Sequence, residues 1–214
     1  MSSADPATET APYDPNTIVN IPNAITFSRL ILAFILLVMI DLGDMWISCA
    51  IVFVVGVTTD VIDGYLARKW NQITVLGRIT DPFVDKVIIG GTLIFLTKIP
   101  ESGVTPWVTF IVIAREMFIT GLRSVLEGHG VDFSAKWSGK LKMFVQSVCI
   151  PFCILSLSQS FLTSLADSTA VFLLIRDALL WAVIVITIYS GAEYCWRGWR
   201  LLQAQNQESF VGPR

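Results

Sequence analysis

Six long apolar stretches dominate this sequence and restrict what it can fold into. They cover residues 24–41, 45–66, 82–98, 106–127, 138–158 and 170–195. A helix needs about 20 mostly apolar residues to cross the hydrocarbon core of a bilayer, and each stretch is close to that length. The hydrophobic fraction of 54% and the mean hydropathy of +0.66 exceed what a soluble domain of 214 residues needs for one core. We therefore expect an all-α integral membrane protein with six transmembrane helices.

The two ends of the chain lack such apolar stretches. Residues 1–20 contain no Lys or Arg and no apolar run, so they lack the basic start and the apolar middle of a secretory signal. We expect an N-terminal tail at residues 1–20, one membrane domain at 21–200 and a C-terminal tail at 201–214.

The basic residues predict the orientation in the membrane. With six spans, twelve of the fifteen Lys and Arg residues lie at the end that carries both termini, whereas Lys98 and Arg176 lie near the other end and Arg115 falls within a span. Short loops rich in Lys and Arg stay in the cytoplasm, so we expect both termini to be cytoplasmic. This basic rim favours membrane lipids or an anionic substrate as partners, and not nucleic acid.

Four aspartates lie at the cytoplasmic ends of the second and third apolar stretches. Asp60 and Asp63 are three residues apart, Asp81 and Asp85 are four apart, and each pair shares one face of a helix. Two antiparallel helices joined by a short loop would gather the four carboxylates around one or two cations. Because the cluster offers hard oxygen ligands and neither His nor Cys, it favours Mg²⁺ or Mn²⁺.

Small residues and a cation accompany the aspartates. Gly64 and Ala67 remove bulk where a phosphorylated ligand would approach the helix backbone, and Arg68 adds a positive charge on the following turn. Gly77 is expected in the turn between the two helices. These features favour a metal-assisted phosphate site.

An alternative is that these are ordinary interfacial charges. In that case Asp60 and Asp63 pair with Arg68 and Lys69, and Asp81 caps the third helix. The joint spacing of four carboxylates and two glycines favours the phosphate site over this alternative.

The same residues carry a resemblance to a known family. They reproduce the pattern D-x2-D-G-x2-A-R-x8-G-x3-D-x3-D, and the chain therefore resembles the CDP-alcohol phosphotransferases. This resemblance implies an enzyme that moves a phosphatidyl-type group from a CDP-linked lipid to an alcohol and releases CMP. It also implies a six-helix fold with a polar cavity open to the cytoplasm.

The resemblance extends to the donor site. Asn23 and Thr26 start the first helix, where they either cap it or contact the nucleotide, and the family pattern favours the nucleotide. The residues expected to bind the CDP-lipid are Asn23, Thr26, Asp60, Gly64, Ala67, Arg68 and Gly77.

Direct in-line attack by the alcohol requires a base for its hydroxyl proton but no protein nucleophile. The expected metal ligands are Asp60, Asp63, Asp81 and Asp85. Asp85, the last of them, is expected to be the general base, as the resemblance also implies.

Three flanking stretches, "NIPNAITFSRL", "AREMFITGLRS" and "GKLKMFVQ", resemble bacterial phosphatidylglycerol phosphate synthases. This resemblance implies CDP-diacylglycerol as donor, glycerol 3-phosphate as acceptor and the bacterial inner membrane as location. A phosphorylated acceptor needs cations, and the candidates are Arg115, Arg123, Lys140 and Lys142. The two lysines are two residues apart, so we expect one of them, Lys140, to face the cavity.

Several alternatives stay open at this point. Arg115 can instead pair with Glu116, Arg123 can anchor its helix at the interface, and Lys136 departs from the small or hydroxylated residue expected there. Inositol phosphate, serine or phosphatidylglycerol are other acceptors in the same family. A cation transporter is a further alternative, although the cluster lies at one membrane face and not at the midplane. The sequence is also compatible with a homodimer. It assigns no role to His129 or to the cysteines.

Overall fold

The structure, a computed structural model, describes residues 21–69, 75–128 and 137–210. Side chains are described along these helices except at residues 21–22, 60–69, 75–79, 127, 202 and 204–210.

Long helices build almost the whole described part of the chain. The six long ones are α1 (Ile21–Leu42), α2 (Trp46–Lys69), α3 (Val75–Leu96), α4 (Pro106–Gly128), α5 (Trp137–Leu155) and α7 (Thr169–Phe210). A short helix α6 (Gln159–Leu165) and two 3₁₀ turns, η1 (Pro100–Ser102) and η2 (Ala166–Ser168), complete the elements. No strand occurs among these residues, so the predicted all-α class is confirmed.

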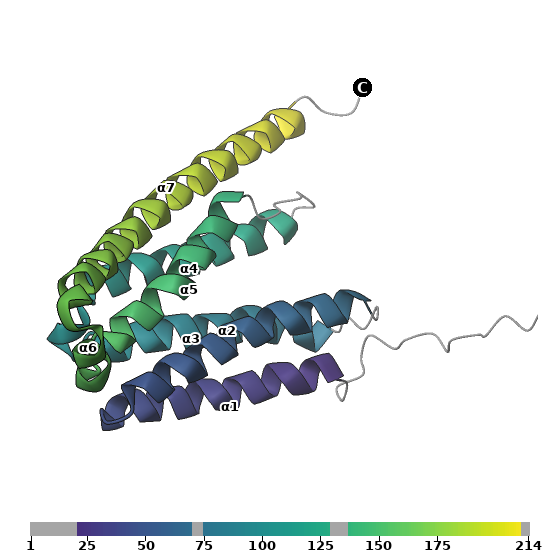
Figure 1. Ribbon diagram of the computed structural model, residues 1–214. Helices are drawn as coiled ribbons and strands as arrows, with labels where there is room; N and C mark the ends of the chain where they lie inside the picture. Colours follow the sequence, from purple (N-terminus) through teal and green to yellow (C-terminus); the bar gives the residue numbers. More distant parts are fainter. Residues whose placement is uncertain (1–20, 70–74, 129–136, 211–214) are drawn as a thin grey trace, which may run out of the picture.

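The long helices form two packed groups (Figure 1). Helix α1 packs against α2 and α3, α7 packs against α4 and α5, and the α2–α5 contact joins the two groups. The helices converge at the end where α6 lies, and the start of α1 lies far from the end of α7 at the opposite end. The shared core is apolar and includes Leu36, Phe53, Ile88 and Ile154.

Among the residues whose side chains are described, three segments are long and apolar enough to cross a membrane: Asn23–Leu42, Trp137–Leu155 and Gln159–Leu201. Large apolar side chains such as Phe34 and Trp181 are exposed on the outer surfaces of the helices, where lipid would cover them. The chain is therefore a membrane protein. The described apolar part of α2 ends at Thr59. The number of six spans stays a prediction.

Helix α3 begins earlier than the sequence predicted. Its first residue is Val75 instead of residue 82, so Gly77 lies inside the helix and not in a turn. Asp81 also lies inside α3, and the alternative that it caps this helix is wrong. The apolar pattern missed these turns because Arg78 and Asp81 interrupt it. At the other end of the chain, α7 continues to Phe210, through most of the predicted C-terminal tail.

The fifth predicted stretch is also shorter in the structure. Helix α5 ends at Leu155, three residues before the expected end. Ser158 then caps α6, because its side chain accepts a hydrogen bond from the backbone N–H of Phe161.

Candidate active site

The polar face of α1 meets the acidic face of α3. Asn23 and Thr26, three residues apart on α1, are both buried, and the Thr26 hydroxyl donates a 2.7 Å hydrogen bond to Asp81 Oδ1. Helix α1 already begins at Ile21, so neither residue caps it and the capping alternative is wrong. The structure thus brings together two of the predicted site residues, Thr26 and Asp81, from different helices.

Arg29 continues this face one turn further, and the sequence analysis did not single it out. Its side chain is 1% exposed, and its Nη2 donates to Asp85 Oδ1 at 2.9 Å. Its Nε donates to the backbone oxygen of Gly56 in α2 at 3.2 Å. An arginine inside an apolar span is energetically costly unless it has a partner within the protein. The presence of Arg29 inside the first apolar stretch was therefore the sequence signal that could have identified it.

The described part of the acidic cluster consists of Asp81 and Asp85. Their carboxylates are hard oxygen donors, which fits Mg²⁺ or Mn²⁺. Among the side chains that the structure describes, no group of three or more His, Cys, Asp or Glu residues could hold a metal ion. The other predicted residues of this site lie outside the described side chains; they are Asp60, Asp63, Gly64, Ala67, Arg68 and Gly77.

All four predicted acceptor-binding cations line a small cavity between α4, α5 and α7. Its volume is about 160 Å³, and its lining residues are Arg115, Glu116, Ile119, Thr120, Arg123, Gly139, Lys140, Lys142, Met143 and Tyr194. Both lysines line it, although the sequence led us to expect only Lys140. Lys142 is buried and Lys140 is exposed, so the two reach the cavity at different depths. We call this space the cation cavity.

Glu116 connects two of these cations. Arg115 Nη1 donates to Glu116 Oε1 at 2.8 Å, and Lys142 Nζ donates to the same oxygen. The alternative that Arg115 pairs with Glu116 is therefore confirmed, but the pair lies in the wall of the cation cavity. Four cations and one carboxylate line this cavity, which leaves three positive charges unmatched among its lining residues. The Nε atoms of Arg115 and Arg123 are buried without a hydrogen-bond partner in the described part of the chain.

Helix α7 supports this wall through Tyr194, a buried residue that the sequence analysis also missed. The Arg115 guanidinium carbon lies 5.4 Å from the centre of the Tyr194 ring, a cation–π contact. A Cβ atom at Gly139 would lie 3.2 Å from the Tyr194 hydroxyl, so α5 and α7 approach closely there. The apolar pattern of this segment predicts a helix but does not mark one of its tyrosines as special.

The carboxylates and the cation cavity lie at a similar depth in the bundle. The Thr109 hydroxyl of α4 donates to the backbone oxygen of Leu93 in α3 at 3.4 Å, which fixes the register of these antiparallel helices. Glu116 is two turns further along α4, about 10 Å, and so lies level with the turn of α3 that contains Asp85. We call the acidic face and the cation cavity together the polar region.

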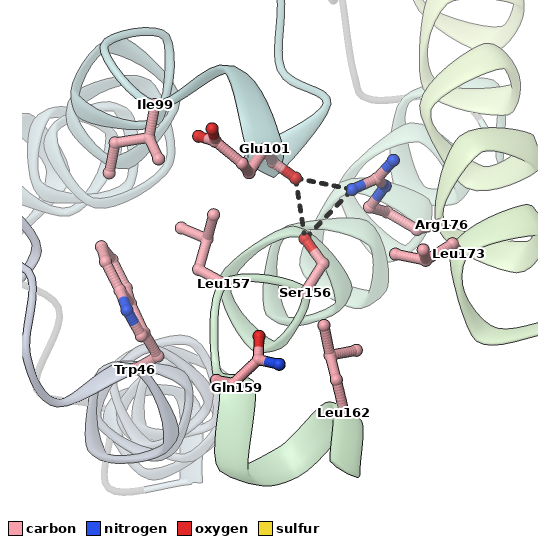
Figure 2. Close-up of a pocket in the computed structure, with 9 residues that line it drawn as sticks. All are labelled: Trp46, Ile99, Glu101, Ser156, Leu157, Gln159, Leu162, Leu173 and Arg176. Carbon is pink, nitrogen blue, oxygen red and sulfur yellow. Dashed lines mark hydrogen bonds between the residues drawn. The ribbon is translucent and has the colours of Figure 1, made fainter. Parts of the chain in front are cut away.

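A larger cavity, of about 530 Å³, lies at the other end of the bundle (Figure 2). Its main cation, Arg176, is already occupied: Nη1 donates to the Glu101 backbone oxygen at 2.7 Å and to Ser156 Oγ at 3.2 Å. The Nε and Nη2 atoms of Arg176 both donate to Asp177 Oδ1. These contacts satisfy the guanidinium, and the described lining of this cavity contains a single carboxylate, that of Glu101.

Comparisons with known proteins show which proteins the chain is similar to. Residues 19–189 match the family model for CDP-alcohol phosphatidyltransferase. The chain is 33% identical over 201 residues to the CDP-diacylglycerol--glycerol-3-phosphate 3-phosphatidyltransferase of Bacillus subtilis, covering 87% of this chain and 99% of that protein. It is 33% identical to a probable phosphatidylglycerophosphate synthase of Mycobacterium tuberculosis, over 86% of this chain and 83% of the relative. A Rickettsia typhi protein with the same name as the Bacillus relative is 29% identical over 82% of this chain and 94% of its own length.

Proposed function

Because the chain belongs to the CDP-alcohol phosphatidyltransferase family, we propose that it transfers the phosphatidyl group of CDP-diacylglycerol to glycerol 3-phosphate. The products are phosphatidylglycerol phosphate and CMP. The names of the bacterial relatives support this donor and this acceptor. The observation in the structure that carries the proposal is the cation cavity, where three positive charges are unmatched by the lining residues.

The size and charge of the cation cavity favour a small phosphorylated alcohol. Its volume of about 160 Å³ is below the roughly 300 to 1,000 Å³ typical of pockets for larger organic ligands. A phosphate monoester carries close to two negative charges and offsets most of the unmatched charge of the cavity. Serine carries no phosphate, and phosphatidylglycerol brings a single charge and two acyl chains. The positive charge also disfavours a route for cations, as a transporter would need.

The reaction then follows from the two halves of the polar region. Arg115, Arg123, Lys140 and Lys142 hold the phosphate of the acceptor, and Asp85 accepts the proton of its attacking hydroxyl. The proposed CDP-lipid contacts are Asn23, Thr26, Asp60, Gly64, Ala67, Arg68 and Gly77. The hydroxyl oxygen forms a bond to the phosphorus of the phosphatidyl group. The bond from this phosphorus to the bridging oxygen of the pyrophosphate breaks, and its electron pair stays on that oxygen, which leaves with CMP.

We further propose that Asp60, Asp63, Asp81 and Asp85 hold Mg²⁺ or Mn²⁺. The family generally depends on divalent metals. A bound divalent cation supplies positive charge that offsets the negative charge developing on the departing CMP. Asp81 would be oriented by its hydrogen bond from Thr26 and Asp85 by its ion pair with Arg29.

The proposal includes a location and an orientation. The six long helices cross the bacterial inner membrane, and the end that carries the aspartates and the cation cavity faces the cytoplasm, where glycerol 3-phosphate is dissolved. Both termini lie on that side. The distribution of Lys and Arg supports this orientation. A homodimer remains compatible with the exposed apolar surfaces.

The acceptor assignment is tested by separate KM values for the two substrates in Arg115→Ala, Arg123→Ala and Lys140→Ala. Each change removes a charge-assisted contact worth roughly 1.5 to 3 kcal/mol, or about tenfold to over a hundredfold in acceptor affinity. We expect the KM for glycerol 3-phosphate to rise this much in at least two variants, while that for CDP-diacylglycerol changes less than about threefold.

The matched control is Lys98→Ala, which removes a cation paired with Asp41 near the other end of the bundle. It should leave both KM values unchanged. If the cation-cavity variants lose affinity for both substrates equally, their cations serve the fold or the donor pyrophosphate, and the assignment of the acceptor site is wrong.

A further inference from the structure

Arg29 is a deeply buried charged side chain in contact with the proposed base. It is 1% exposed and lies in the middle of a three-helix contact: its own helix is α1, its Nη2 reaches Asp85 on α3 and its Nε reaches the Gly56 carbonyl on α2. Because it is almost fully enclosed, it is shielded from any substrate that enters the polar region.

The geometry of these contacts depends on the guanidinium group. Its planar fork sends one N–H to a carboxylate and another to a backbone carbonyl in a fixed relative direction, and a lysine ammonium lacks this fork. The Gly56 carbonyl belongs to helical backbone and cannot swing, so it fixes the direction of the guanidinium and, through it, of Asp85 Oδ1.

The contact between Arg29 and Asp85 is one of two successive side-chain contacts between α1 and α3, and Thr26 makes the other. Thr26 and Arg29 lie three residues apart on α1, Asp81 and Asp85 lie four apart on α3, and the two helices pair them in order. Two successive turns of α1 thus hold two successive carboxylates of α3. A shift of one turn would separate both pairs at once.

We propose that Arg29 is a positioning residue that sets the orientation of the Asp85 carboxylate toward the acceptor hydroxyl without touching either substrate. This inference rests on the proposed function, because it takes Asp85 as the base. It predicts an effect on turnover that is separate from substrate affinity and from the stability of the bundle.

The test compares Arg29→Lys and Arg29→Gln with the wild type in detergent. CMP release, the KM for both substrates and the thermal unfolding midpoint are measured for each protein. A displacement of the base by about 1 Å costs roughly a hundredfold in rate. We expect kcat of Arg29→Lys to fall at least about tenfold, with both KM values within about threefold and the unfolding midpoint close to that of the wild type.

A double substitution tests whether Arg29 acts through Asp85. Adding Asp85→Asn to Arg29→Lys should lower the residual rate no further than Asp85→Asn alone, since the positioned group is already lost. Lys98→Gln is the control, because Lys98, two residues past the end of α3, pairs with Asp41 of α1 far from the site. It should leave kcat unchanged.

Three results would overturn the inference. If Arg29→Lys keeps full turnover, Arg29 serves helix packing alone. The same conclusion holds if kcat falls only together with a large loss of thermal stability and Lys98→Gln shows the same two losses. A wild-type protein that releases CMP with another alcohol but not with glycerol 3-phosphate contradicts the proposed acceptor and leaves the Arg29 comparison valid with that alcohol. A wild type inactive with every alcohol contradicts both proposals.

Discussion

Glu116 is the carboxylate on which the walls of the cation cavity depend. It accepts hydrogen bonds from Arg115 and Lys142, and the Lys142 side chain is 2% exposed. Removing one partner of a buried ion pair leaves the other charge without compensation, which costs on the order of 3 kcal/mol. We therefore predict that Glu116→Gln lowers the free energy of unfolding by about this amount.

The measurement is thermal unfolding in detergent, with and without glycerol 3-phosphate. Adding Lys142→Met to Glu116→Gln removes the uncompensated charge and should recover part of the lost stability. Glu101→Gln is the control, because that exposed carboxylate lies at the other end of the bundle. A double variant less stable than Glu116→Gln alone would show that Glu116 and Lys142 do not act as a pair.

At this scale the sequence predicted the cations and, as an alternative, the pairing of Arg115 with Glu116, but it did not predict that Lys142 shares this carboxylate. Arg115, Arg123, Lys140 and Lys142 stand out as charges near apolar segments, and the structure places all four around one cavity. Tyr194 gave no comparable signal, because a tyrosine in an apolar helix is ordinary. Its role depends on the packing of α7 against α4 and α5, which no local pattern encodes. Whether the four cations bind the acceptor stays a prediction.

Among the elements, the turn between α3 and α4 sets how the far end of the bundle closes. Gly103 ends η1 with a φ of +75°, and a Cβ atom there would lie 3.1 Å from the Arg176 guanidinium. A residue other than glycine in this backbone region costs roughly 1 to 3 kcal/mol. We predict that Gly103→Ala lowers the free energy of unfolding by about 1 to 3 kcal/mol, as measured by thermal or denaturant unfolding in detergent.

The control for this substitution is Gly121→Ala in the middle of α4, where a Cβ atom would meet nothing within 4 Å. Alanine is the better helix former by about 1 kcal/mol, so this change should be neutral or stabilising. If Gly103→Ala were as stable as the wild type, the turn would have to relax without strain, contrary to its backbone geometry.

The helices themselves were largely predictable, but their ends were not. Apolar length located all six long helices, because a membrane span needs a long run of apolar side chains. The start of α3 was missed by seven residues, since its first turns carry the polar residues of the site. Helix α6 was missed because seven residues are too few to span a membrane and their pattern resembles a loop. The register of α1 against α3 required the structure, since it depends on contacts between distant residues.

For the whole molecule, the orientation in the membrane decides which compartment supplies the acceptor. We predict that single cysteines at residues 99–105 react with an impermeant thiol reagent in intact cells, whereas those at 70–76 and 129–135 react only after lysis. The background for this experiment must first lose the free cysteines Cys49, Cys149, Cys153 and Cys195. The reverse labelling pattern would place the cation cavity outside the cell and contradict the proposed access of glycerol 3-phosphate.

The central claim is that one polar region joins a CDP-lipid to a phosphorylated alcohol. Its most direct test measures CMP release by the purified protein with CDP-diacylglycerol, Mg²⁺ or Mn²⁺, and a set of alcohols that includes glycerol 3-phosphate, glycerol, inositol phosphate and serine. We predict rapid CMP release with glycerol 3-phosphate, formation of phosphatidylglycerol phosphate in equal amount, and little release with unphosphorylated glycerol. Equal rates with glycerol and its phosphate would contradict the role of the cation cavity, and with it the account of the reaction given above.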